Sequence, residues 1–144
     1  MTLESILIAN RGEIAIRIAR AAADLGLRAV TVATNDDADS LHTTAADECV
    51  TLPGVGARGY LDADAIIKAA KESGCDAIHP GYGFLSERSE FAVACGAADL
   101  RWIGPSASLL ALFGDKGQAR AAAIAAGVPV NAGVDHPVDV TEAA

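Results

Sequence analysis

Short apolar runs alternate along the chain with longer stretches in which apolar residues return every three or four positions. A short continuous apolar run is typical of a parallel strand covered on both faces, whereas the longer spacing indicates a helix with one apolar side. The alternation predicts an α/β fold: a Rossmann-like, doubly wound parallel sheet of about five strands with helices on both faces. The expected strands are 6–9, 29–33, 49–52, 76–79 and 101–103.

Residues that commonly start and stop helices stand at the ends of the helical stretches. Asn10 is expected to cap the first helix, and Gly26 is expected to end it. The apolar stripe of that helix consists of Ile14, Ile18, Ala22 and Leu25. Because these residues fall on one side of a helix, we expect all of them to face the sheet. Asp62 and Ser106 are expected to cap two later helices.

A glycine loop follows the fourth expected strand, within the stretch 78–87. Gly81 and Gly83 allow the backbone to turn where a Cβ atom would clash, and they allow another molecule to approach the main chain closely. Pro80 fixes its own φ and favours an extended conformation in the residue before it. The loop is therefore a candidate ligand site.

The chain after this loop is expected to be helical, with Ser86 as the N-cap and Glu87 in the first turn. A strand, an exposed glycine loop and a helix make the geometry in which open α/β sheets bind ligands. From spacing alone, a plain turn with Tyr82 packed for support remains an equal alternative.

The segment 54–59 contains a literal G-x-G-x-x-G, formed by Gly54, Gly56 and Gly59. In a dinucleotide site this motif joins the first strand directly to its helix, so that the pyrophosphate meets the helix amino terminus. Here it follows the third expected strand, and Asp62 is the expected N-cap. The sequence therefore favours a flexible surface loop over a cofactor cradle.

An acid-rich loop follows the second expected strand. Its polar residues are Asn35, Asp36, Asp37, Asp39 and His42. A calcium-binding EF-hand loop needs glycine at its sixth position and glutamate at its twelfth. Counted from Asp36, those positions hold Leu41 and Asp47. We therefore expect a loop that caps the next helix and binds no calcium.

The formal net charge of −8 argues against a surface that binds nucleic acid or an anionic membrane, since either needs a basic patch. No apolar run approaches the roughly eighteen residues that a membrane-spanning helix needs. Neither a nucleic acid nor a membrane is therefore expected as a partner.

The expected compartment is the cytoplasm. Strand-like sequence begins at Leu3, which leaves no room for a signal or transit peptide. Cys49, Cys75 and Cys95 are odd in number and lack C-x-x-C spacing, so reduced and mostly buried thiols are expected.

Four motifs together resemble the biotin carboxylase family, the ATP-dependent component of acetyl-CoA, propionyl-CoA and pyruvate carboxylases. They are IANRGEIA at 8–15, HPGYGFLSE at 79–87, GDK at 114–116 and AGVP at 126–129. Their order and approximate spacing match the family from about residue 4 to residue 134. The resemblance is to the first, pre-ATP-grasp domain of a much longer enzyme.

This resemblance implies an ATP-dependent ligase. The family uses MgATP to activate bicarbonate as carboxyphosphate and then carboxylates biotin on a carrier protein. Its partners are the remaining ATP-grasp and C-terminal domains, the biotin carboxyl carrier protein and the carboxyltransferase. The glycine-rich lid, the glutamates that hold magnesium and the general base lie in those later domains. The resemblance thus implies no catalytic residue and no metal ligand in this chain, and an inactive isolated segment.

Individual residues inherit roles from the matching motifs. Lys116 of the GDK motif is implied to contact ATP phosphates, although spacing alone would leave it and Arg120 as two solvated cations. The resemblance places Tyr82 and Gly83 towards the biotin pocket. Arg20 and Asp24 match residues that form the subunit interface in the family, which implies a homodimer.

Residues 1–130 are expected to form the pre-ATP-grasp domain, and residues 131–144 a linker with the start of a truncated next segment. Two departures from the family pattern are Gly117 and the pair Asn131-Ala132. Two alternatives remain open: the corresponding domain of another ATP-grasp ligase, such as a carbamoyl-phosphate synthetase, and a non-catalytic binding or assembly module.

Overall fold

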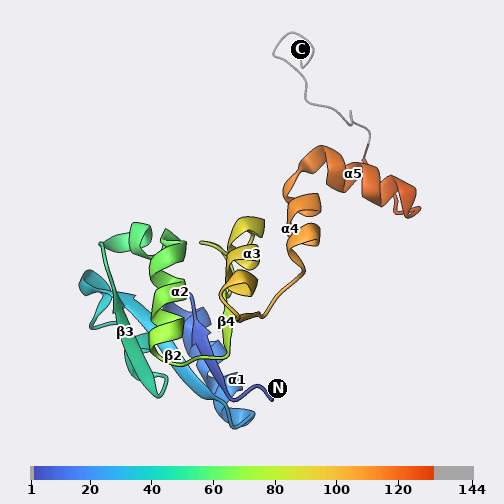
Figure 1. Cartoon of the computed structure of the whole chain (residues 1–144). Helices are drawn as coiled ribbons and strands as arrows, with labels where there is room; N and C mark the ends of the chain where they lie inside the picture. The colour runs from blue at the N-terminus through green and yellow to red at the C-terminus, as the bar shows by residue number, and fades with distance from the viewer. Residues whose placement is uncertain (1, 132–144) are drawn as a thin grey trace.

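A five-stranded, all-parallel sheet with helices on both faces forms the body of the molecule in a computed structural model that describes residues 2–131 (Figure 1). Its strands are β1 (Ser5–Ile8), β2 (Arg28–Thr34), β3 (Glu48–Leu52), β4 (Ala77–His79) and β5 (Arg101–Trp102). Their spatial order is β3-β2-β1-β4-β5. The predicted Rossmann-like parallel sheet is confirmed, and every expected strand is present within one or two residues at its ends.

The direction of chain progression reverses between β1 and β4. From β1 the chain moves outward through β2 to β3, and then crosses back to place β4 on the other side of β1. Loops that leave the carboxyl ends of β1 and β4 therefore start side by side. In open α/β sheets this switch point is where ligands bind.

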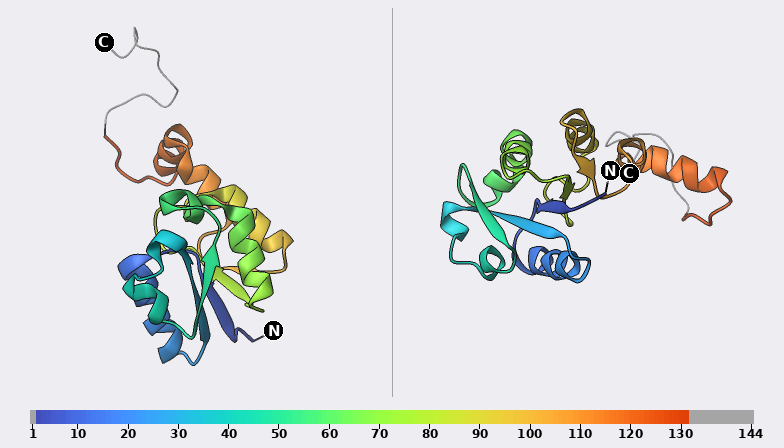
Figure 2. Two further views of the ribbon diagram at one scale, coloured as in Figure 1. Left: turned by 90° about the vertical axis from the view of Figure 1, so that its left-hand side faces the viewer. Right: turned by 60° about the horizontal axis from the view of Figure 1, so that its bottom comes forward.

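Helix α1 covers one face of the sheet, and α2 and α3 cover the other (Figure 2). The helices are α1 (Gly12–Asp24), α2 (Ala63–Glu72), α3 (Ser89–Ala97), α4 (Ala107–Gly114) and α5 (Lys116–Ala125). The part of the chain that the structure describes also has short 3-10 helices, namely η1 (Asn35–Asp37), η2 (Leu41–Thr44) and η3 (Gly56–Leu61).

Strand β1 divides its side chains between two cores. Ile6 and Ile8 pack on the α1 side, whereas Leu7 and the following Ala9 pack on the side of α2 and α3. Successive strand residues point to opposite faces, so a run that is apolar throughout suits a strand covered on both. Burying each Leu or Ile contributes about 1.5–3 kcal/mol. The central strand is therefore fixed by packing from two directions.

Most helix ends follow the sequence signals. Asp62 accepts a hydrogen bond from the Ala65 N–H at 3.0 Å and Ser106 accepts one from the Leu109 N–H at 3.3 Å, which confirms both predicted caps. The prediction that Leu25 faces the sheet is wrong, because this residue is 75% exposed. It lies just after α1, where the chain turns through Gly26 in the left-handed region, so its side chain leaves the sheet.

Helices α4 and α5 extend away from the sheet (Figure 1). Helix α4 packs against α3 and α5 packs against α4, but neither α4 nor α5 contains a buried residue. Asp115 separates the two helices and caps α5 through a 2.9 Å bond from the Gln118 N–H. Apart from Asn131, the segment 131–144, expected to be a linker with the start of a next segment, lies outside the described residues. The domain boundary near residue 130 thus stays a prediction.

Candidate functional site at the switch point

Asn10 joins the two loops that meet at the switch point. It follows β1, is only 2% exposed, and donates two hydrogen bonds through Nδ2, to the Pro80 carbonyl at 2.7 Å and the Tyr82 carbonyl at 2.8 Å. Its Oδ1 accepts a bond from the Arg11 N–H at 2.9 Å. The prediction that Asn10 caps α1 is therefore wrong: the N-cap position is Arg11, which makes no side-chain cap.

The two glycines of the loop after β4 have different reasons to be glycine. Both have φ in the left-handed region, +67° for Gly81 and +66° for Gly83. A Cβ atom on Gly81 would lie 2.7 Å from Asn10 Nδ2, whereas one on Gly83 would meet nothing within 4 Å. Gly81 thus allows close contact with Asn10, and Gly83 turns the chain beside open space.

Tyr82 projects from this loop with 60% of its surface exposed. Its hydroxyl donates a hydrogen bond to Glu13 Oε1 at 2.8 Å, which links the loop to the first turn of α1. That bond to a carboxylate raises the pKa of the Tyr82 phenol. The side chain is held at one end and open along its face, which differs from a ring packed in the core for support.

The segment after the loop forms a turn where the sequence predicts a helix. Helix α3 begins at Ser89, and Ser86 makes no side-chain cap there. Its backbone N–H instead bonds the Gly83 carbonyl at 2.9 Å. Phe84 has a left-handed φ of 45°, which no right-handed helix accommodates, and Leu85 is buried. The predicted helix start at Glu87 is therefore wrong by two residues, because packing of this turn takes precedence over the local capping signal.

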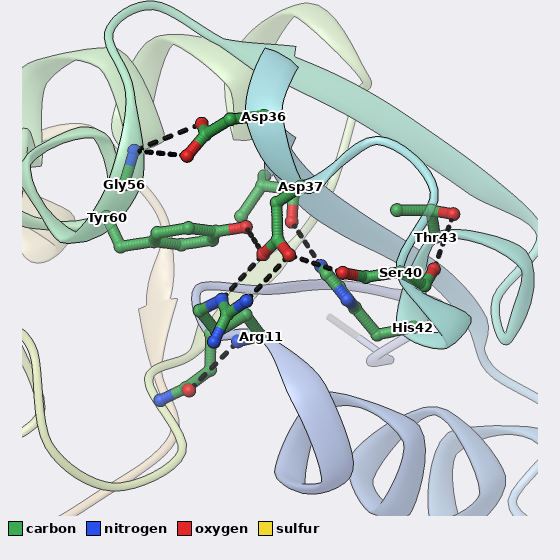
Figure 3. A network of polar contacts seen from close by, with 10 residues as sticks. Arg11, Asp36, Asp37, Ser40, His42, Thr43, Gly56 and Tyr60 are labelled. Atoms are coloured by element: carbon green, nitrogen blue, oxygen red, sulfur yellow. Dashed lines mark hydrogen bonds and ion pairs between the residues drawn. The ribbon is translucent and has the colours of Figure 1, made fainter.

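Arg11, the residue after Asn10, forms the centre of a second polar network together with Asp37 (Figure 3). Arg11 Nε lies 2.5 Å from Asp37 Oδ2, and Arg11 Nη2 lies 2.6 Å from Oδ1, so the ion pair is bidentate. The buried Tyr60 donates its hydroxyl to Asp37 at 2.6 Å, and Ser40 donates another hydrogen bond. The Arg11 guanidinium holds the pKa of Asp37 well below its usual range. Burial and, to a smaller extent, the hydrogen bond to Asp37 raise the pKa of Tyr60 to about 12.

Asp36, the neighbour of Asp37 in this loop, contacts the glycine-rich segment. Both carboxylate oxygens of Asp36 accept the Gly56 N–H, each at 3.0 Å (Figure 3). A Cβ on Gly59 would lie 2.2 Å from Thr34 Cγ2, so this glycine is needed for packing against β2. The G-x-G-x-x-G segment thus serves internal contacts. Across residues 2–131, no group of three or more His, Cys, Asp or Glu side chains could hold a metal ion.

The family model described as "Biotin carboxylase, N-terminal domain" matches residues 2–110. The chain belongs to this family. The resemblance to the biotin carboxylase family is therefore confirmed by a match that includes the first two motifs, and the match favours biotin carboxylases over the carbamoyl-phosphate synthetase alternative.

Individual relatives of this biotin carboxylase domain are much longer. The chain is 51% identical over 139 residues to the mitochondrial pyruvate carboxylase of Mus musculus, covering 94% of this chain and 12% of that protein. It is 48% identical over 137 residues to the biotin carboxylase of Haemophilus influenzae, covering 94% of this chain and 31% of that protein. The chain thus spans less than a third of the length of either relative.

Solved structures agree with this assignment. The biotin carboxylase domain of a single-chain bacterial carboxylase superposes with a TM-score of 0.86 and 52% identity, covering 88% of this chain and 30% of that one. A single-chain, multi-domain long-chain acyl-CoA carboxylase gives a TM-score of 0.87 and 54% identity, covering 90% of this chain and 13% of that one. The chain therefore corresponds to one domain of these longer carboxylases.

Lys116 of this biotin carboxylase domain is exposed at the first position of α5. Helix α5 extends away from the sheet (Figure 1), whereas Tyr82 and Gly83 belong to the loop that follows β4. Arg120 is not a second free cation beside it, because its Nη1 donates to the Asn131 carbonyl at 2.6 Å. The structure therefore separates the candidate phosphate contact from the candidate biotin loop.

Arg20 and Asp24 are exposed on the outer side of α1. Together with Glu13 and Arg17 they line a shallow depression of this helix. The position is accessible to another molecule, as a subunit interface requires.

The three cysteines are free, and Cys75 and Cys95 are buried. Burial raises the pKa of each of these two thiols to about 11, which makes them poor nucleophiles. Among residues 2–131, no helix has the length and apolar character needed to cross a membrane.

Proposed function

We propose that this chain acts as the N-terminal domain of a biotin carboxylase that uses MgATP and bicarbonate to carboxylate biotin on a carrier protein. The observation that carries the proposal is the family match over residues 2–110, which includes both loops of the switch point. Its partners would be the ATP-grasp and C-terminal domains, the carrier protein and the carboxyltransferase. A cytoplasmic location, expected from the sequence, is part of the proposal.

Within this domain we assign Tyr82 and Gly83 to the biotin side of the active site. Tyr82 is exposed along its ring, and Gly83 borders open space, so both are accessible to a ligand. Biotin would supply the ureido nitrogen that accepts the carboxyl group. The chain's own contribution is to bind and orient that ring system.

Lys116 is assigned to the ATP phosphates. Its ammonium group is exposed and can act as a point charge on a phosphate. The adjacent amino terminus of α5 has fewer N–H groups to offer a phosphate, because the Asp115 carboxylate already accepts the Gln118 N–H. Lys116, a single cation beside the Asp115 carboxylate, would form only part of a phosphate-binding site. The isolated chain is therefore expected to be inactive. Arg20 and Asp24 are assigned to a homodimer interface.

A chimera tests this function. The segment of Haemophilus influenzae biotin carboxylase that aligns with this chain would be replaced by this chain, and ADP release that depends on bicarbonate and biotin would be measured. We expect activity, and a loss of about a hundredfold when the chimera carries Lys116→Ala. A chimera carrying Lys68→Ala, another exposed lysine, serves as the control. A folded chimera without activity would refute the proposal.

A further inference from the structure

Every polar group of the buried Asn10 side chain makes a hydrogen bond to a neighbouring backbone group. Both Nδ2 bonds go to the loop after β4, on carbonyls that stand two residues apart, and Oδ1 takes the Arg11 N–H. The amide cannot be reversed, since its oxygen would then face two carbonyl oxygens. A buried polar group satisfied in this way specifies one arrangement of the groups around it.

Those two carbonyls flank Gly81, so Asn10 determines the path of the backbone into Tyr82. Gly81 lies so close to the amide that a Cβ would come within 2.7 Å of Nδ2. The His79 ring supports the same turn, because Nδ1 accepts the Gly81 N–H at 3.0 Å. The start of the loop is thus held from both sides.

Glu13 holds the tyrosine side chain itself. The hydrogen bond from the Tyr82 hydroxyl to Oε1 connects residues 69 positions apart in the sequence. Without this bond an exposed tyrosine ring could adopt several rotamers. One carboxylate in the first turn of α1 therefore selects the direction in which the Tyr82 ring points.

A third contact holds the far end of the loop. The Phe84 ring packs on Tyr60 with 5.3 Å between ring centroids, and Tyr60 is fixed in turn by Asp37 and Arg11 (Figure 3). Gly83 is left between anchored neighbours, with open space beside it.

We infer that Asn10 and Glu13 are positioning residues that hold Tyr82 and Gly83 in the geometry needed for ligand binding. The identity of that ligand as biotin rests on the proposed function. The positioning itself stands on the contacts of the loop. It assigns a purpose to the first motif, IANRGEIA: two of its residues shape the second motif, HPGYGFLSE.

The first experiment measures loop geometry in the 144-residue chain. Asn10→Asp keeps the shape of the side chain but replaces the donor with an oxygen facing two carbonyls. We expect amide hydrogen exchange of residues 81–84 to accelerate at least about tenfold, with β2 and β3 unchanged. Asn35→Asp makes the same chemical change on the surface and should leave exchange unaltered. Unaltered exchange in Asn10→Asp would overturn the inference.

A second pair of variants tests the contact between Asn10 and Gly81 by changing the loop. This pair tests the positioning role of Asn10 even if Asn10→Asp does not fold. Gly81→Ala and Gly83→Ala incur the same left-handed φ penalty, but only the first collides with Asn10. We expect exchange in residues 81–84 to be faster in Gly81→Ala than in Gly83→Ala. Equal exchange in the two variants would contradict a positioning role for Asn10.

Glu13 is tested by the titration of Tyr82, one of only two tyrosines, with ring-labelled NMR. In Glu13→Gln the phenol pKa should fall towards its ordinary value and the ring signals should show averaging over rotamers. Glu90→Gln, an exposed acid on α3, serves as the control. A titration curve identical to that of the unmodified chain would show that Glu13 does not hold the ring.

A separate measurement distinguishes this inference from the proposed function. In the chimera described above, Asn10→Asp and Glu13→Gln should raise the KM for free biotin at least about fivefold and leave the KM for MgATP unchanged. If the loop moves by NMR and exchange but the KM for biotin does not change, the assignment of the loop to biotin fails while positioning stands. If the loop does not move, positioning fails.

Discussion

Arg11 and Asp37 form a bidentate ion pair that ties the carboxyl end of β1 to the carboxyl end of β2. Asn10, the residue before Arg11, reaches the opposite way and bonds the loop after β4. Two consecutive residues therefore connect the two halves of the sheet at the point where the chain direction reverses.

Asp37→Asn should destabilise the chain. The change removes the charge that pairs with Arg11, while an amide nitrogen in place of Oδ2 would face donors from Arg11 Nε and the Tyr60 hydroxyl. Because the Arg11 side chain is 46% exposed and water can solvate it, we expect a loss of about 1–3 kcal/mol, less than for a fully buried pair. Urea denaturation measures the difference. Asp39→Asn, at an exposed position of the same loop, should change stability little.

The contribution of Asp37 should disappear in acid. Its pKa is lower in the folded chain than in the unfolded chain, where it is about 3.9. Such a group stabilises the fold fully above the unfolded pKa, and its contribution is lost as the pH falls through the folded pKa. The free energy of unfolding should therefore decline below about pH 4, and the gap between the original chain and Asp37→Asn should narrow over the same range. If the difference in free energy of unfolding between the two chains did not change with pH, the ionised Asp37 carboxylate would not be the stabilising group.

Two alanine substitutions should have opposite effects. Gly59→Ala places a Cβ 2.2 Å from Thr34 Cγ2 and 3.0 Å from the Pro53 carbonyl, so we expect a loss of about 1–3 kcal/mol. Gly96→Ala lies in α3 with nothing within 4 Å, and should stabilise the chain by about 0.5–1 kcal/mol. Thermal or urea unfolding measures both. If Gly59→Ala were neutral, the glycine-rich segment would not be held by packing.

MgATP should bind the isolated chain weakly or not at all. Lys116 is the assigned phosphate contact, and one exposed cation makes a weak site. Calorimetric titration of the chain, of Lys116→Ala and of the control Lys68→Ala should give little heat in all three. Tight binding that is lost only in Lys116→Ala would mean that this domain carries a working nucleotide site by itself.

The sheet could be predicted from the sequence because its strands are buried on both faces and are therefore apolar throughout, as Ile6, Leu7 and Ile8 are. The caps at Asp62 and Ser106 could also be predicted from the sequence, since an N-cap depends only on residues up to three positions away.

The two wrong capping predictions come from residues whose surroundings are set by partners far along the chain. Asn10 carries a capping signal, but its hydrogen bonds lie 70 and 72 residues away. Ser86 carries another, but the preceding turn is set by Phe84 and its contact with Tyr60. Nor did any local pattern pair Arg11 with Asp37. The one available hint was that a polar residue directly after a buried strand lies at the edge where ligand loops meet.

Helices α4 and α5 give the molecule two levels of stability. Because neither contains a buried residue, separating this pair from α3 removes little apolar surface from contact, whereas opening the sheet exposes both cores at once. Local opening of the pair thus requires far less free energy than global unfolding. Lys116 lies on the pair that opens easily, and Tyr82 lies on the more stable sheet. A neighbour that orders the pair would therefore control the proposed phosphate contact without altering the loop at the switch point.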